Sequence, residues 1–129
     1  MTQEGLTRLR DNGRVINIST GLTRAAAMSE LIAYAMSKGA VDVFTLNLAK
    51  DLGARGITVN TIAPGVVDTD INADWLRGND EALAATAARS PLNRVAEPAE
   101  IADIAAFLAS DDSRWVTGQW IDATGGALI

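Results

Sequence analysis

Two stretches of the chain, residues 14–20 and 57–63, are rich in β-branched side chains and nearly free of charge. Each is bounded by glycine or proline. Continuous runs of this kind are typical of parallel strands that are buried on both faces of a sheet. A third apolar run at 115–122 contains a glycine and predicts a last, short strand.

Between the first two strands, apolar residues recur every three or four positions over residues 30–52. This spacing predicts a long helix, and the order strand, helix, strand predicts a right-handed crossover between parallel strands. Val43 and Leu46 lie off the main stripe, so a second side of the helix could meet another subunit. The main stripe consists of Val41, Phe44, Leu48 and Leu52.

Three further helices are predicted after the second strand. Residues 72–77 and 80–89 are two short segments of mixed alanine and charge, and their pattern fits a lid over a ligand or an ordinary surface hairpin. A helix then opens at Glu97, with a proline in its first turn, and ends at Asp111. The alternation of strands and helices predicts an α/β fold, and we expect residues 1–129 to form one structural unit.

The composition narrows the functions that such a fold could serve. A net charge of −5 argues against nucleic acid and against anionic membrane surfaces as partners. The chain has no cysteine and no histidine, and its carboxylates are scattered, so we expect no metal site. No apolar run is long enough to span a membrane, and the first residues are polar and acidic, unlike a signal peptide. These features favour a cytoplasmic protein.

Tyr34 and Lys38 carry the clearest candidate chemistry in the chain. Being four residues apart on the predicted helix, they project from the same face, one turn apart. A phenol beside an ammonium group is a way to transfer protons without histidine.

Polar or turn-forming residues also end both predicted strands. Ser19 and Thr20 close the first strand, and Pro64 and Gly65 follow the second. Ligands of open α/β sheets bind at the carboxyl ends of the strands, so the two hydroxyls are candidates for chemistry. Alternatively, they cap the loop that follows.

Five motifs in this order resemble the short-chain dehydrogenase/reductase family, and in particular the branch of 3-oxoacyl-carrier-protein reductases and sugar or alcohol dehydrogenases. The resemblance implies a Rossmann-type, doubly wound parallel sheet, of which this chain would hold three strands with flanking helices. The motifs are residues 17–20, the Tyr-x-x-x-Lys pattern at Tyr34 and Lys38, residues 56–60 with 63–65, residues 68–70, and residues 116–119 with 125–126.

The resemblance implies three catalytic roles. Tyr34 would donate or accept the proton at the substrate oxygen, and Lys38 would stabilise the phenolate and bind the ribose next to the nicotinamide. A hydroxyl at the end of the first strand would hold the substrate oxygen. Thr20 matches the serine of the family, but its spacing to Tyr34 is longer by one residue than the family pattern, so Ser19 stays an alternative.

The resemblance also implies a nicotinamide cofactor, NAD or NADP, and a small alcohol or carbonyl substrate. Pro64, Gly65 and Val67 would pass close to the nicotinamide, and Thr69 would hydrogen-bond its carboxamide. The loop at 22–29 and the segment at 70–94 would shape the substrate pocket.

The chain departs from the family in one large respect. A complete member is roughly twice as long and carries a glycine-rich turn that holds the pyrophosphate, and no such turn is present here. The sequence therefore resembles the C-terminal half of the family's domain. We expect the first strand to expose an apolar edge, which a second copy, another chain or a missing half would cover, and we therefore expect a homo-oligomer. The alternatives are an NAD(P)-dependent oxidoreductase, an inactive oligomerisation or interaction module, and a half-enzyme that needs a complementary N-terminal half.

Overall fold

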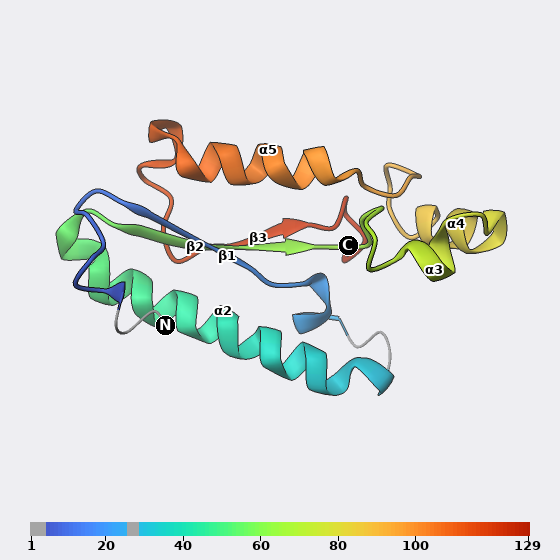
Figure 1. The fold of residues 1–129 in the computed structure, drawn as a ribbon, viewed down its shortest axis with the longest axis horizontal. Helices are drawn as coiled ribbons and strands as arrows, with labels where there is room; N and C mark the ends of the chain where they lie inside the picture. Colours follow the sequence, from blue (N-terminus) through green and yellow to red (C-terminus); the bar gives the residue numbers. More distant parts are fainter. Residues whose placement is uncertain (1–4, 26–28) are drawn as a thin grey trace.

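Three parallel strands form the sheet of this protein, whose computed structural model describes residues 5–25 and 29–129 (Figure 1). Strand β2 (Thr58–Pro64) lies in the centre, between β1 (Arg14–Ile18) and β3 (Trp120–Ala123). The predicted α/β class and the parallel order of the strands are confirmed.

The central strand β2 is the most deeply buried element of the sheet. Its first six residues are all buried, as its β-branched sequence predicts. Strand β1 is less buried than its sequence pattern predicts, and Ile18 is 47% exposed. Within the described residues β1 pairs with β2 alone, so its other edge is open. The expectation of an exposed edge is thus confirmed.

The third strand begins later than predicted. Residues 115–119 form a loop, because Gly118 adopts the left-handed conformation with φ 69° and interrupts any extended segment. The side chain of Asn60 in β2 holds this loop in place. Its amide nitrogen donates to the Val116 carbonyl oxygen at 2.8 Å, and its amide oxygen accepts from the Gln119 nitrogen at 3.0 Å.

The long helix α2 (Ile32–Leu52) covers one face of the sheet, after the short turn η2 (Ser29–Leu31). Its buried residues are Thr45, Leu48, Ala49 and Leu52. The predicted stripe was therefore wrong at Phe44, which is 39% exposed, because Thr45 takes the buried position next to it. The hydroxyl of Thr45 accepts a hydrogen bond from Asn17 Nδ2 at 2.8 Å and lies 2.7 Å from Thr61 Oγ1, so its burial leaves no unpaired polar group.

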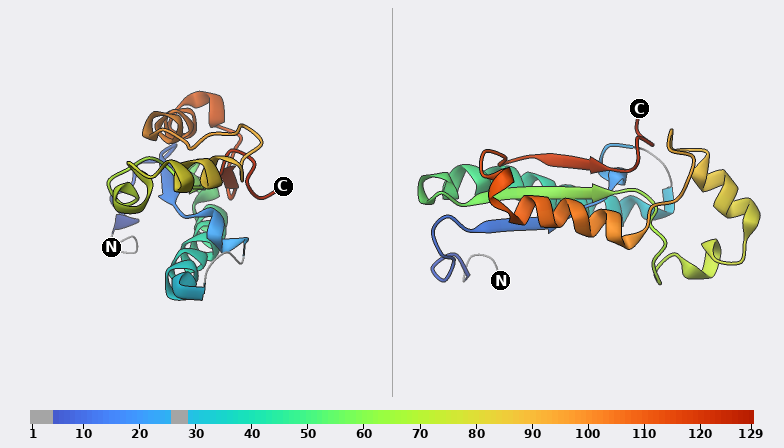
Figure 2. Two further views of the ribbon diagram at one scale, coloured as in Figure 1. Left: turned by 90° about the vertical axis from the view of Figure 1, so that its right-hand side faces the viewer. Right: turned by 90° about the horizontal axis from the view of Figure 1, so that it is seen from above.

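Helix α5 (Pro98–Ala109) covers the opposite face, so the sheet is the middle of three layers (Figures 1 and 2). Leu108 is fully buried against Ile62 and Ala123 of the sheet. The helix begins with a capping box, in which the Glu97 nitrogen donates to the carboxylate of Glu100 at 2.9 Å. The predicted helix is thus confirmed, although it ends at Ala109 and not at Asp111. Its partly buried apolar residues are Ile101, Ile104 and Ala105.

Two short helices, α3 (Ala73–Leu76) and α4 (Asp80–Ala87), extend beyond the carboxyl end of β2 (Figure 1). They confirm the two predicted segments. Helix α3 is shorter than expected because Arg77 is extended, and α4 is shorter because residues 88–89 form a turn, in which the Arg89 nitrogen donates to the Thr86 carbonyl oxygen at 3.2 Å. No helix within residues 5–25 and 29–129 is both long and apolar enough to cross a membrane.

Candidate active site

The candidate residues of the first strand lie in the turn after β1, not in the strand itself. The main chain still holds them against the sheet, since the Ser19 nitrogen donates to the Ile62 carbonyl oxygen of β2 at 2.8 Å. Ser19 and Thr20 are both buried, with 3% and 8% of their surface exposed. The next residues form the short turn η1 (Gly21–Thr23). These hydroxyls therefore sit at the carboxyl edge of the sheet.

Lys38 joins helix α2 to the end of β1. Its ammonium group donates a hydrogen bond to the Ile18 carbonyl oxygen at 2.8 Å, and its own carbonyl oxygen accepts a long hydrogen bond of 3.5 Å from Ser19 Oγ. An ammonium group has three hydrogen-bond donors, and within residues 5–25 and 29–129 two of those of Lys38 have no partner. Helix and strand end are thus held together at the point where the predicted chemistry lies.

Tyr34 lies one turn before Lys38 on the same helix. The Lys38 ammonium nitrogen is 5.8 Å from the centroid of the tyrosine ring, within the range of a cation–π contact. The side chain of Tyr34 is 43% exposed. The ring of Tyr34 therefore lies beside the ammonium group, and its exposure leaves it accessible to a small molecule.

Ser19 and Thr20 differ in what their hydroxyls do. Ser19 Oγ faces the main chain of α2 at Lys38, whereas Thr20 Oγ1 accepts a hydrogen bond from the Leu22 nitrogen at 3.4 Å and caps η1. The capping alternative thus describes Thr20 in this structure, although a bond of 3.4 Å is weak. Which of the two would hold a substrate oxygen stays a prediction.

The residues after β2 form a second group at the same edge. Gly65 lies tightly against the C-terminal segment, because a Cβ atom on it would be 3.0 Å from Thr124 Cα. Val67 is buried and forms a parallel bridge with Ala96. The hydroxyl of Thr69 makes only a long hydrogen bond of 3.5 Å, to the Val67 carbonyl oxygen. Thr69 can therefore bind a ligand at little cost.

Thr124 connects the two groups, and sequence reasoning missed it. It also lies against Gly21, where a Cβ atom would be 2.8 Å from Thr124 Cγ2 and 3.6 Å from the Pro64 carbonyl oxygen. Glycine is needed at Gly21 and Gly65 because the turn after β1, the turn after β2 and the C-terminal segment approach one another so closely. The Gly125–Gly126 pair beside Thr124 was the only signal in the sequence.

The loop and lid residues around this edge are described only in part. Residues 26–28 of the predicted pocket loop lie outside the described residues. The segment at 70–94 is attached to the C-terminal segment by Ser90, whose hydroxyl donates to the Gly125 carbonyl oxygen at 2.6 Å. The predicted lid is thus anchored at its far end.

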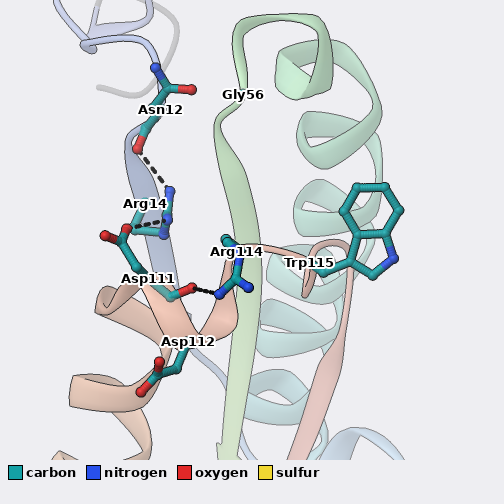
Figure 3. Close-up of a pocket in the computed structure, with 7 residues that line it drawn as sticks. All are labelled: Asn12, Arg14, Gly56, Asp111, Asp112, Arg114 and Trp115. Atoms are coloured by element: carbon teal, nitrogen blue, oxygen red, sulfur yellow. Dashed lines mark hydrogen bonds and ion pairs between the residues drawn. The ribbon is translucent and has the colours of Figure 1, made fainter.

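A separate cavity of about 1000 Å³ lies at the opposite edge of the sheet (Figure 3). Arg14 Nη2 donates to Asp111 Oδ1 there at 3.3 Å, and Arg114 Nη1 donates to the Asp111 carbonyl oxygen at 2.9 Å. Arg14 begins β1, whereas the candidate hydroxyls follow its last residue, so this cavity is not where the predicted site residues gather. Its lining consists of Asn12, Arg14, Gly56, Asp111, Asp112, Arg114 and Trp115.

Comparison with known proteins extends over nearly the whole chain. The family model described as Enoyl-(Acyl carrier protein) reductase matches residues 1–127. A solved structure of a Serratia marcescens short-chain dehydrogenase/reductase is 33% identical, with a TM-score of 0.89 over 99% of this chain and 51% of that one. The chain belongs to the short-chain dehydrogenase/reductase family. The resemblance and the Rossmann-type sheet predicted from the sequence are therefore confirmed.

Two further members of the short-chain dehydrogenase/reductase family show what such relatives do. Versicolorin reductase stcU of Emericella nidulans is 37% identical over 99% of this chain and 52% of its own length. The angucycline C-6 ketoreductase LanV, solved with bound NADP, is 45% identical with a TM-score of 0.85 over 98% of this chain and 48% of its own. The chain spans about half the length of these relatives.

Proposed function

We propose that this chain carries the catalytic residues and the nicotinamide side of an NAD(P)-dependent oxidoreductase, which interconverts a carbonyl and an alcohol on a small molecule. The observation that carries the proposal is the position of Lys38. Its ammonium group is hydrogen-bonded to the end of β1 while Tyr34 stands one turn away with an accessible phenol. The reductase and ketoreductase names of two relatives support the reaction class.

Tyr34 holds the proton that moves at the substrate oxygen. In reduction the phenol donates this proton as the carbonyl becomes an alcohol, and in oxidation the phenolate takes it back. Lys38 stabilises the phenolate through its positive charge. Thr20 or Ser19 donates a hydrogen bond that orients the substrate oxygen. The nicotinamide, when bound, supplies or accepts the hydride.

The residues at this edge fit the nicotinamide end of the cofactor. Within the described residues Lys38 has two further donors for ribose hydroxyls, and the hydroxyl of Thr69 is nearly free for a carboxamide. Pro64, Gly65 and Val67, at the end of β2 and just after it, would pass close to the nicotinamide. NADP(H) is the first cofactor to test, since LanV holds NADP. NAD stays the alternative.

A second copy of the chain covers the outer face of α2 in this proposal. Met36 is 70% exposed, Val43 60% and Leu46 59%, which is unusual for large apolar side chains on one helix.

The acidic composition without cysteine supports a cytoplasmic location, and residues 1–129 act as one structural unit.

A second candidate function is that of an interaction module or a half-enzyme. The open edge of β1 among the described residues favours it, because an unpaired strand edge can pair with a strand of another chain. In this case the chain would show activity only after a complementary N-terminal half pairs with β1.

The reaction is tested by following NADPH oxidation with a panel of cyclic and aromatic ketones, for the chain and for Tyr34→Phe. The variant keeps the ring and removes the hydroxyl, so we expect an intact fold by circular dichroism and a loss of at least about 100-fold in turnover. Full activity in Tyr34→Phe would refute the assigned proton donor. Activity that appears only with a complementary half would favour the second candidate.

A further inference from the structure

The loop that carries Thr69 is fixed by a single arginine at the end of α3. Arg77 Nε donates to Asp68 Oδ1 at 2.6 Å, and Arg77 Nη1 donates to Asp70 Oδ1 at 3.0 Å. The two carboxylates are the residues immediately before and after Thr69. A planar guanidinium that binds both holds three consecutive residues in one arrangement. The hydrogen bonds that Arg77 donates to Asp68 and Asp70 also raise its pKa.

The main chain of this loop has further attachments on both sides. Asn72 Nδ2 donates to the Val67 carbonyl oxygen at 2.8 Å, and the Asn72 nitrogen donates to the Thr69 carbonyl oxygen at 2.9 Å. On the other side, the Asp68 nitrogen donates to the Ala96 carbonyl oxygen at 2.9 Å. The hydroxyl of Thr69 is the group that these attachments leave nearly free.

Arg77 lies in the chain between the loop at residues 68–70 and the outer helix α4. Gly78 follows it, with open space where a Cβ atom would stand, and Asn79 caps α4. In Figure 1, α3 and α4 lie next to each other beyond the end of β2. The ion pairs of Arg77 thus attach the end of α3 to the loop that carries Thr69. Helix α4 comes after Gly78 in the chain.

We propose that Arg77 is a positioning residue, which holds residues 68–70 so that the hydroxyl of Thr69 is presented to the nicotinamide. The inference rests on the function proposed above and adds a residue that does not itself touch the cofactor. Since Arg77 and its partners are exposed, the ion pairs hold one loop in a fixed conformation but contribute little to the stability of the whole fold.

Arg77→Gln removes the charge and the fork of donors, and Arg89→Gln is the matched control. Arg89 is exposed at the end of the same segment and forms no ion pair within the described part of the chain. Both changes remove one positive charge that would attract an anionic cofactor. Arg77→Lys keeps the charge but cannot bind two carboxylates in the same way.

Hydrogen exchange by mass spectrometry tests the loop directly. We expect faster exchange in peptides that contain the Asp68 and Asn72 amides for Arg77→Gln, with Arg89→Gln unchanged and α5 unchanged in both. Equal exchange in the two variants would overturn the role of Arg77 in fixing the loop.

Titration with NADPH, followed by nicotinamide fluorescence, tests the consequence. We expect affinity to fall about 3- to 10-fold in Arg77→Gln, less in Arg77→Lys and hardly at all in Arg89→Gln. Equal affinities of Arg77→Gln and Arg89→Gln would overturn the positioning role, even if the exchange differs. Absence of NADPH binding to the unchanged chain would overturn the proposed function and with it the ligand of Thr69, whereas the exchange result would still decide whether Arg77 fixes the loop.

Discussion

The two faces of the sheet are built differently. On the α5 face, Ile62 and Leu108 meet in a cluster in which each is fully buried. On the α2 face, Leu52 and Val59 form an apolar core near the amino ends of the strands, but hydrogen-bonded Thr45 and Thr61 follow toward the carboxyl ends. The α5 face is packed by apolar side chains. On the α2 face, apolar packing is replaced by hydrogen bonds between polar side chains toward Tyr34 and Lys38.

This difference shows that the α5 face mainly stabilises the fold, whereas the α2 face also positions the residues of the candidate site. Apolar packing is tolerant of small shifts because it has no direction, whereas hydrogen bonds fix the distance between two elements. The contacts of Asn17, Thr45 and Thr61 join β1, α2 and β2 two turns away from Lys38. They fix the position of α2 along the sheet. In this position the Lys38 ammonium group lies within hydrogen-bond distance of the Ile18 carbonyl oxygen.

The largest expected effect is on the α5 face. Leu108→Ala leaves a cavity in a fully buried cluster and should lower the free energy of unfolding by about 2–5 kcal/mol. Urea unfolding followed by circular dichroism measures this loss. A loss below about 1 kcal/mol would show that α5 is not a closing element of the core.

On the α2 face, Thr45→Val keeps the shape of the side chain but removes the hydroxyl between Asn17 and Thr61. Because the buried hydroxyl of Thr61 and the half-buried amide of Asn17 lose a partner, we expect a loss of about 1–3 kcal/mol in the free energy of unfolding. Thr45→Ser is the matched control, since it keeps the hydroxyl. If the valine and serine variants were equally stable, the polar contacts would not hold the helix.

The smallest effect concerns the start of α5 and depends on pH. Hydrogen bonds from Arg94 and from the Glu97 main chain lower the pKa of Glu100 to about 2. A carboxyl whose pKa is lower in the folded state stabilises the fold above its unfolded pKa of 4.5, and this contribution is lost as the pH falls toward about 2. Thermal melts of the chain and of Glu100→Gln should differ at pH 6 and converge near pH 2. A difference independent of pH would contradict the ionic origin.

Much of the fold could be predicted because its signals are local. The runs that form β1 and β2 and the proline in the first turn of α5 are all read from neighbouring residues. The start of β3, next to Gly118, could not be predicted, because the loop before it is held by Asn60, which is distant in sequence. The burial of Thr45 in place of Phe44 likewise depends on partners in two other elements.

The candidate site divides in the same way. Tyr34 and Lys38 could be found because one helix carries both, and the resemblance supplied Pro64, Gly65, Val67 and Thr69. The contact of Lys38 with Ile18 and the closeness of Thr124 to the glycines arise only when the chain folds. No pattern in the sequence pairs Arg77 with the carboxylates beside Thr69.

The most direct test of the account is a fluorescence titration with NADPH of the chain, of Lys38→Met and of Lys50→Met. Both lysines lie on α2, but Lys50 is exposed near its other end and far from the carboxyl edge of the sheet. We predict saturable binding to the chain, about ten-fold or more weaker binding to Lys38→Met, and unchanged binding to Lys50→Met. Equal affinities of the two variants, or no saturation with the unchanged chain, would contradict the assignment of this edge as the nicotinamide site.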